Sequence, residues 1–403
     1  MLHSQSREHG FFVGSPDQSA IGFALQVPTR WRFGMGVLAE LGKEAGLLGA
    51  RVLLMSGRRA MRELGVLDRV LGVLGDSGLE VELFEGVSAN PRTDEVEEAV
   101  LRGRGIKADV VIGLGGGSVL DAAKAAGAAL SCGVPVGELL QNSTPIDRSV
   151  PVVAVPTTAG TGSELSRGAI LTDHGRRFKG GLRGNGLFPA VALVDPELSM
   201  MMPDALARLT GFDVLCHAVE TYFSRQSHAM LHSLSLGAVA VVRDCLMRPV
   251  AGLEDRVRAM QMAYASSMMG INLGNATTCL PHRMQYAIGA LTDTSHPEGL
   301  AALYPEWFAA VVKADPVKAR RLLGVLFSDA GEAEEAFGDP TGAMIRVLGE
   351  IGVSRTLQEL GVKSEEDLRW CISHVSGASA VDPAYASGET IEQIFLSAFK
   401  RGC

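Results

Sequence analysis

The chain has 403 residues, of which 47% are hydrophobic and 20% are charged, and its formal net charge is −8. This length is enough for two or three domains with large cores. The negative charge and the absence of a basic block exclude nucleic acid and anionic membrane surfaces from the expected partners. The N-terminus lacks a signal-peptide pattern, no uninterrupted apolar run has the length of a membrane helix, and the six cysteines include no C-x-x-C pair. We therefore expect a cytoplasmic protein with free thiols.

The first half of the chain alternates between apolar strands and helices. Residues 1–22 are polar and predict a ragged extension, after which a short strand, a glycine-rich turn and a helix follow. Further strands are predicted at Arg51–Ser56, Leu79–Phe84, Asp109–Leu114, Val150–Val155 and Val191–Val194. Helices are predicted between them, including Asp94–Arg102 and Val119–Leu130. The alternation predicts an α/β domain, residues 23–200, whose parallel sheet is covered on both faces.

The second half, residues 201–403, has helical periodicity and few strand candidates. Helices are predicted at Ala205–Leu209, Phe212–Phe223, Met230–Leu246, Leu253–Met269, Pro305–Ala314, Pro316–Leu326, Ala343–Ile351, Glu365–Val375 and Ile391–Ala398. We expect an all-helical domain here. Because no long linker separates it from the first domain, the two are expected to pack closely around a cleft, where small-molecule sites tend to form.

Two polar, glycine-containing loops follow predicted strands. Gly115–Ser118 (GGGS) precedes a helix, where glycines let the backbone approach a phosphate and the helix N-terminus offers free N–H groups. It matches neither G-x-G-x-x-G nor a P-loop, and a tight turn that binds nothing can have the same composition. Thr157–Glu164 (TTAGTGSE) follows another strand, at the edge where ligands bind in open parallel sheets. Together the two loops predict a dinucleotide site.

An acid and three histidines in the second half have the composition of a metal site. Asp213 and His217 are four residues apart, so they share one face of a helix. With His282 and His296 they offer one carboxylate and three imidazoles, an ordinary ligand set for a divalent metal. Lone histidines on apolar helices are more often hydrogen-bonded core residues. The pair His228 and His232 has the same spacing but no carboxylate within helical reach.

The motifs GGGSVLDAAK, PTTAGTGSE, VDPEL and LTGFDVLCHAVETY, in this order and spacing, resemble the iron-containing (group III) alcohol dehydrogenases over about residues 27–308. The resemblance implies a dinucleotide-binding α/β domain, an all-α C-terminal domain in the dehydroquinate synthase-like fold, and a catalytic divalent metal in the cleft. It implies that the metal ligands, which also serve catalysis, are Asp213, His217, His282 and His296. It implies cofactor contacts from Asn90, Gly116, Gly117, Ser118, Thr157, Thr158, Thr161 and Lys179.

One departure from the family concerns acid–base chemistry. Many members have a second histidine four residues after the ligand at His282, close to the nicotinamide, and this chain has Tyr286 there. A phenol can relay a proton, but its ordinary pKa of ~10 makes it a poorer acid–base group than imidazole at neutral pH. The hydroxyacid–oxoacid transhydrogenase branch also has a tyrosine at this position. We assign Tyr286 a catalytic role.

A second departure concerns the cofactor. NAD-using members often have an aspartate after the first strand, which binds the ribose diol. Here the position is Gly57, followed by Arg58 and Arg59. Glycine leaves room for a 2′-phosphate and a guanidinium can pair with it, so we predict that NADP(H) is favoured over NAD(H). The same arginines are also typical of a solvated helix start.

Arg283, next to His282, is a candidate substrate residue. If it faces the cleft, it favours an anionic aldehyde such as a semialdehyde or phosphonoacetaldehyde. Adjacent helical residues point in different directions, and an arginine there can equally lie on the surface.

The resemblance implies reversible, metal-dependent reduction of an aldehyde to a primary alcohol by NAD(P)H. We expect Fe²⁺, with Zn²⁺ as the alternative, and a homodimer or higher homo-oligomer. Alternatives are a hydroxyacid–oxoacid transhydrogenase, glycerol dehydrogenase-like polyol oxidation, dehydroquinate synthase-like lyase chemistry, and a cofactor-binding protein without catalysis.

Overall fold

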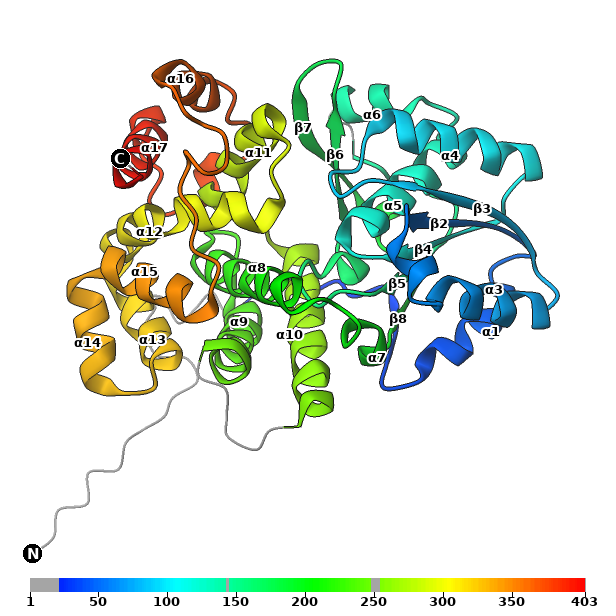
Figure 1. Ribbon diagram of the computed structural model, residues 1–403, viewed down its shortest axis with the longest axis horizontal. Helices are drawn as coiled ribbons and strands as arrows, with labels where there is room; N and C mark the ends of the chain where they lie inside the picture. Colours follow the sequence, from blue (N-terminus) through cyan, green and yellow to red (C-terminus); the bar gives the residue numbers. More distant parts are fainter. Residues whose placement is uncertain (1–21, 143–144, 248–253, 403) are drawn as a thin grey trace, which may run out of the picture.

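A computed structural model describes residues 22–142, 145–247 and 254–402. Nearly all of the predicted N-terminal extension therefore lies outside the described residues. The chain forms an α/β half and a helical half, seen right and left in Figure 1. The α/β half is built on a six-stranded parallel sheet with the strand order β1-β8-β5-β4-β2-β3. Its strands are β1 (Arg30–Phe33), β2 (Arg51–Gly57), β3 (Glu80–Val87), β4 (Val110–Gly115), β5 (Val152–Pro156) and β8 (Val191–Val194).

Both faces of the sheet are covered, as the continuous apolar runs of the central strands require. Every residue of β4 and β5 is buried. Alternate residues of β2 enter different cores: Leu53 and Met55 pack on one side, and Val52 and Leu54 on the other. One face carries α1 (Leu41–Gly46) and α3 (Val66–Asp76), with the short α2 (Ala60–Glu63) beside α3. The other face carries α4 (Thr93–Ile106), α5 (Gly117–Cys132) and α6 (Val136–Asn142). The predicted α/β sandwich is confirmed.

An antiparallel hairpin, β6 (Gly168–Asp173) and β7 (Phe178–Arg183), stands apart from the main sheet. Sequence analysis did not predict it. The segment FKGGLR has two adjacent glycines and two cations, so it lacks the alternation of apolar residues that predicts a strand. In the structure β6 packs on α5, and β7 contacts both α6 and α11 (Leu280–Thr292). The hairpin therefore reaches from the α/β half to the helical half (Figure 1).

In the described residues beyond β8 there are helices and loops but no strands. The helices are α7 (Pro196–Ser199), α8 (Asp204–Phe223), α9 (Ala229–Val242), α10 (Asp255–Asn275), α11, α12 (His296–Ala314), α13 (Pro316–Leu326), α14 (Ala330–Gly338), α15 (Pro340–Ile351), α16 (Glu365–Ser373) and α17 (Gly388–Arg401). Two predicted segments join into α8 across Gly211, and α11 and α14 were not predicted. The prediction that a helix begins at Pro305 was wrong, because α12 begins nine residues earlier and contains this proline.

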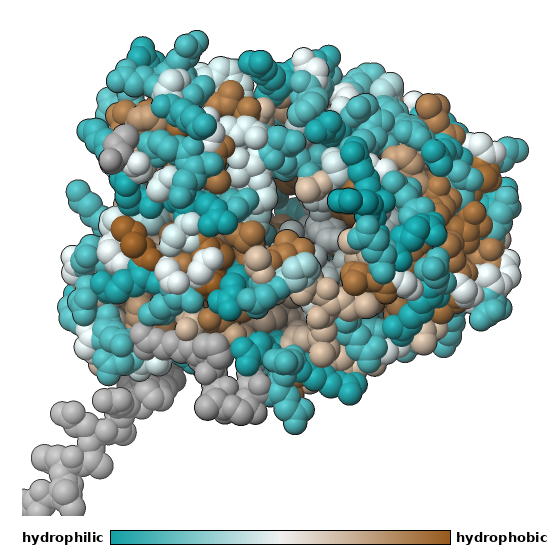
Figure 2. All heavy atoms as spheres, viewed as in Figure 1, coloured by the Kyte–Doolittle hydropathy of each residue, from teal (hydrophilic) through white to brown (hydrophobic). Residues whose placement is uncertain are grey.

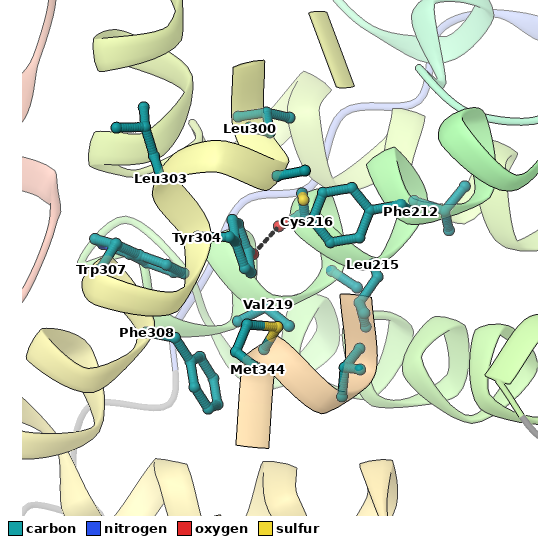
Figure 3. Close-up of a cluster of buried hydrophobic side chains, with 14 of the residues drawn as sticks. Phe212, Leu215, Cys216, Val219, Leu300, Leu303, Tyr304, Trp307, Phe308 and Met344 are labelled. Carbon is teal, nitrogen blue, oxygen red and sulfur yellow. Dashed lines mark hydrogen bonds between the residues drawn. The ribbon is translucent and has the colours of Figure 1, made fainter. Parts of the chain in front are cut away.

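The core of the helical half fixes α8 against α12. Phe212 of α8 meets Tyr304 of α12 edge to face, with ring centroids 5.5 Å apart, and the Tyr304 hydroxyl donates a hydrogen bond to the Cys216 carbonyl oxygen at 3.2 Å (Figure 3). Trp307 lies in the same cluster and donates from Nε1 to Asp382 at 2.7 Å. These contacts hold α8 and α12 in a fixed relation to each other. This matters for the site because both helices carry predicted metal ligands.

One described segment, Ala229–Met247, is long and apolar enough to cross a membrane by length and composition, and α5 with α6 passes only as a pair bent by 95°. The sequence predicts a helix at Met230–Leu246 but not a membrane span there, because histidine and serine residues interrupt its apolar run. The segment comprises α9 and a following π-helical turn, and α9 packs between α8 and α10. These contacts cover part of the helix, and 39% of the segment is buried.

The two halves meet backbone to backbone at Gly162, in the TTAGTGSE loop. Its φ is +61°, and a Cβ there would lie 2.4 Å from the backbone nitrogen of Gly270 in α10. We expect Gly162→Ala to lower the free energy of unfolding by more than the ~1–2 kcal/mol that left-handed backbone alone costs a residue with a Cβ. Denaturant unfolding measures this. The control is Gly72→Ala in α3, where a Cβ meets nothing within 4 Å and stability should be unchanged or higher.

Candidate metal centre and cofactor cleft

The four predicted metal ligands come together at the inner surface of the helical half. Asp213 and His217 lie one turn apart on α8, His282 is in the first turn of α11, and His296 begins α12. The Asp213 Oδ1 atom is 3.8 Å from Nε2 of each histidine. Nε2 of His217 and Nε2 of His282 are 3.0 Å apart. The ligand atoms of Asp213, His217 and His282 all lie within 4.8 Å of one another, and His296 approaches the same Asp213 oxygen from α12.

Two further side chains orient the histidines. Glu220, one turn after His217 on α8, places Oε1 2.7 Å from Nδ1 of His282, and its Oε2 accepts from the Cys279 backbone N–H at 2.8 Å. Gln285 places Oε1 2.5 Å from Nδ1 of His296. With Nδ1 as the donor in each pair, Nε2 carries a lone pair toward the centre. Sequence analysis missed both residues, although each lies three positions after a predicted ligand and so shares its helix face.

The electrostatics of this cluster suit a cation. Burial lowers the pKa of all three histidines well below the usual range, so their rings are neutral at neutral pH. Burial, and then the nearby Glu220 carboxyl, raise the pKa of Asp213. The Asp213 Oδ1 is buried and has no hydrogen-bond partner within the described part of the chain. Because a buried polar oxygen without a partner is costly, one carboxylate and three imidazoles in this arrangement fit a divalent metal ion.

The predicted cofactor loops lie opposite, at the carboxyl ends of β4 and β5. Gly116 precedes α5, whose N-terminus faces the cleft through Gly117 and Ser118. A Cβ on Gly117 would lie 2.5 Å from the Thr161 side chain, so glycine is required for the two loops to approach. Thr157 donates its backbone N–H to the Gly115 carbonyl at 3.0 Å. The arrangement supplies free N–H groups and a helix dipole to a phosphate.

Asn90 and Lys179 belong to the same wall and connect the halves. The Lys179 ammonium donates to Asn90 Oδ1 at 2.8 Å, and Asn90 Nδ2 donates to Asp293 Oδ1 in the helical half, also at 2.8 Å. Burial lowers the pKa of Lys179 to about 8. Both side chains therefore already have partners in the protein, in addition to facing the cleft.

A cavity between the halves joins these two groups of residues, and Figure 2 shows a hollow between them on this face. Among the predicted site residues, those lining it are Asn90, Gly117, Ser118, Thr161, Lys179, Asp213, His217, His282, Tyr286 and His296. Those that do not line it are Gly57, Gly116, Thr157, Thr158 and Arg283. The first four of these still lie at the carboxyl ends of β2, β4 and β5.

Tyr286 lies where the predicted proton relay is expected. Its side chain is buried, and its ring centroid is 6.3 Å from that of His296. Burial raises the pKa of Tyr286, so the phenol stays protonated at neutral pH. Its hydroxyl makes no hydrogen bond to the described residues.

The two arginines after β2 differ in their surroundings. Arg58 pairs with Glu95 at 2.7 Å. Arg59 is exposed at the start of α2, and no ion pair engages it among the described residues. The paired Arg58 is thus held by the protein itself.

The sequence matches two family profiles in tandem. Residues 28–196 match that of iron-containing alcohol dehydrogenase, and residues 207–399 match that of the C-terminal region of the same family. The chain belongs to the iron-containing alcohol dehydrogenases. The predicted family is therefore confirmed.

Relatives within this family match along nearly their whole length. The chain is 31% identical to 1,3-propanediol dehydrogenase of Klebsiella pneumoniae, covering 94% of this chain and 99% of the relative. It is 30% identical to lactaldehyde reductase of Escherichia coli strain K12, covering 84% and 89%. A crystal structure of an iron-containing alcohol dehydrogenase from Thermotoga maritima superposes with a TM-score of 0.82 at 29% identity, covering 94% of this chain and all of the other. This iron-containing alcohol dehydrogenase is thus an oxidoreductase, and its candidate metal site faces the loops that follow β4 and β5.

Proposed function

We propose that this protein is a cytoplasmic, homo-oligomeric enzyme that reversibly reduces an aldehyde to a primary alcohol with a nicotinamide cofactor and a divalent metal, Fe²⁺ in preference to Zn²⁺. The observation that carries the proposal is the convergence of three histidine Nε2 atoms on Asp213 Oδ1, at 3.8 Å each, in a cavity that Gly117 and Ser118 also line. Relatives named for 1,3-propanediol and lactaldehyde support this class of substrate.

Each part of the site has a distinct task in this proposal. Asp213, His217, His282 and His296 would hold the metal, which would supply Lewis-acid polarisation of a carbonyl oxygen, and a bound nicotinamide would supply hydride to the carbonyl carbon. Water or the protonated Tyr286 hydroxyl donates the proton that completes the alcohol. Glu220 and Gln285 hold the histidine rings in the required orientation.

The test is the loss of the reduced nicotinamide absorbance with a panel of aldehydes, using enzyme loaded with Fe(II) or with Zn(II). We expect turnover that depends on the aldehyde and produces one alcohol per cofactor oxidised. Catalysis without net cofactor oxidation would instead indicate lyase chemistry, and no oxidation with any aldehyde would refute the proposal.

For the cofactor, we propose NADP(H) in preference to NAD(H). Gly57 presents no carboxylate to repel a 2′-phosphate, and Arg59 is exposed two residues later. Replacing Arg59 by glutamine is expected to raise the KM for NADPH about tenfold, the low end of what a charge-assisted hydrogen bond contributes, and to leave that for NADH unchanged. Steady-state kinetics with both cofactors measures this. Arg58→Gln is the matched control, because Arg58 already pairs with Glu95. A wild-type enzyme that prefers NADH would refute the assignment.

A further inference from the structure

Two arginines from different halves of the protein share one hydroxyl group beside the cavity. Arg183, at the end of β7, donates from Nη2 to Thr277 Oγ1 at 2.9 Å. Arg283, on α11, donates from its own Nη2 to the same oxygen. Thr277 lies in the loop between α10 and α11. One neutral oxygen atom therefore holds two positively charged groups close together.

No carboxylate neutralises this pair. Among the described residues, no Asp or Glu oxygen forms an ion pair with either guanidinium, whereas Arg92 pairs with Asp293. Against the larger effect of burial, Arg283 lowers the pKa of Glu220, but the oxygens of Glu220 are engaged by His282 and Cys279. Two like charges this close repel each other, so an anion between them or beside them is favoured.

The two side chains differ in access to the cavity. Arg283 is buried and does not line the cavity; its Cζ is 5.9 Å from the centre of the Tyr286 ring, and its Nε has no hydrogen-bond partner among the described residues. Arg183 lines the cavity itself and is exposed to it. Its Nε and Nη1 make no hydrogen bond within the described part of the chain. The guanidinium of Arg183 thus presents a free edge with the fork geometry that binds an oxyanion through two parallel hydrogen bonds.

Arg183 lines the same cavity as Tyr286 and the metal residues. The Tyr286 ring centroid is 6.3 Å from that of His296 and 5.9 Å from Cζ of Arg283. The glycine loop that faces a cofactor phosphate belongs to α5, while Arg183 belongs to the hairpin and contacts the loop before α11. A molecule bound at the metal residues would therefore occupy the same cavity that the Arg183 side chain lines.

We propose that Arg183, backed by Arg283 through Thr277, is the anion-recognising residue of the substrate pocket, and that the substrate is a short-chain aldehyde with a terminal carboxylate, sulfonate or phosphonate. This inference rests on the proposed aldehyde reductase function and deepens it. It also shifts the substrate contact predicted for Arg283 to Arg183, because Arg283 does not line the cavity.

The kinetic test compares wild type with Arg183→Gln, both loaded with metal, on aldehydes of matched length that end in carboxylate, sulfonate, phosphonate or methyl. Wild type is expected to favour one or more of the charged aldehydes. The variant is expected to lose about 10- to 100-fold in kcat/KM for those, the effect of one hydrogen-bonded charge, and less than about threefold for the neutral aldehyde. Arg183→Lys keeps the positive charge but lacks the paired N–H donors of a guanidinium, so its kcat/KM for charged aldehydes should lie between those of Arg183→Gln and wild type. Comparison of the three charged aldehydes identifies which oxyanion the site binds.

The control variant is Arg176→Gln, which removes the same charge from the far end of the same hairpin, where Arg176 pairs with Asp173. It should leave all aldehydes unaffected. Equal losses for charged and neutral aldehydes in Arg183→Gln, or a rise in the cofactor KM instead, would overturn the proposal.

A binding measurement separates this inference from the proposed function. Calorimetry of the metal-loaded enzyme with propionate, ethanesulfonate and ethylphosphonate, which cannot be reduced, is expected to show binding that Arg183→Gln weakens and Arg176→Gln does not. If no aldehyde is turned over but this difference is found, the aldehyde reductase function fails and the anion site stands. If aldehydes are reduced but none of the three anions binds to wild type, the anion site fails alone.

Discussion

Removal of the divalent metal is expected to lower kcat by about 10³-fold or more, because Lewis-acid stabilisation contributes several kcal/mol and each ~1.4 kcal/mol is tenfold in rate. The measurement is aldehyde-dependent NAD(P)H oxidation after exhaustive chelation, followed by anaerobic reloading with single metals. We expect Fe(II) to restore the highest turnover. Zinc binds such nitrogen and oxygen sites more tightly, so each reloading must contain one metal alone.

Asp213→Asn provides the matched variant. It should lose turnover to a similar extent, while its metal-free form should be at least as stable as metal-free wild type. Burial and Glu220 raise the pKa of Asp213, so ionising this side chain in the folded state opposes folding when no cation is bound. Thermal unfolding of the two metal-free proteins measures this. Full activity in enzyme shown by elemental analysis to be metal-free would contradict the metal-dependent function.

The second large effect is expected at Glu220, which is not a predicted metal ligand but contacts one. Both its oxygens accept hydrogen bonds, one from His282 and one from the Cys279 backbone N–H. A glutamine in its place can accept only one of them and turns an N–H₂ donor toward the other donor. We expect Glu220→Gln to weaken metal binding about 10- to 100-fold, the usual effect of removing a partner of a ligating histidine. Competition with a chromogenic chelator measures the metal Kd.

A matched control for Glu220→Gln is Glu306→Gln, which replaces a partly buried glutamate of α12 that pairs with Arg401. It is expected to change stability but not the metal Kd. At saturating metal, Glu220→Gln should regain a substantial part of its turnover, which distinguishes weakened binding from a misfolded site. An unchanged metal Kd in this variant would show that Glu220 does not position His282.

The sequence predicts those parts of the site that depend on local periodicity. The four-residue spacing of Asp213 and His217 fixes their shared face once a helix is assigned, and the buried strand before Gly115 predicts where the phosphate loop lies. His282 and His296 are different, because their convergence depends on how α11 turns into α12 and packs on α8. That relation involves tertiary contacts such as Phe212 with Tyr304, so it came from the family resemblance instead.

The parts that sequence analysis missed have weak local signals. Arg183 was overlooked because the hairpin that carries it has a glycine-rich second strand. Arg283 is a candidate from sequence because it adjoins a ligand, but neighbouring helical residues point in different directions, and in the structure it does not line the cavity. Glu220 does have a signal in the sequence, because its helical spacing to His217 marks it as a candidate hydrogen-bond partner of a metal-ligating histidine.

The hairpin has a consequence for motion. Arg183 at the end of β7 is anchored to Thr277 of the helical half, and Lys179 on the same strand is linked through Asn90 to Asp293. Elsewhere, Gly162 and Gly270 are in backbone contact. Any separation of the two halves would therefore have to break hydrogen bonds at both ends of β7, so we expect this strand to restrict hinge-like opening of the cleft.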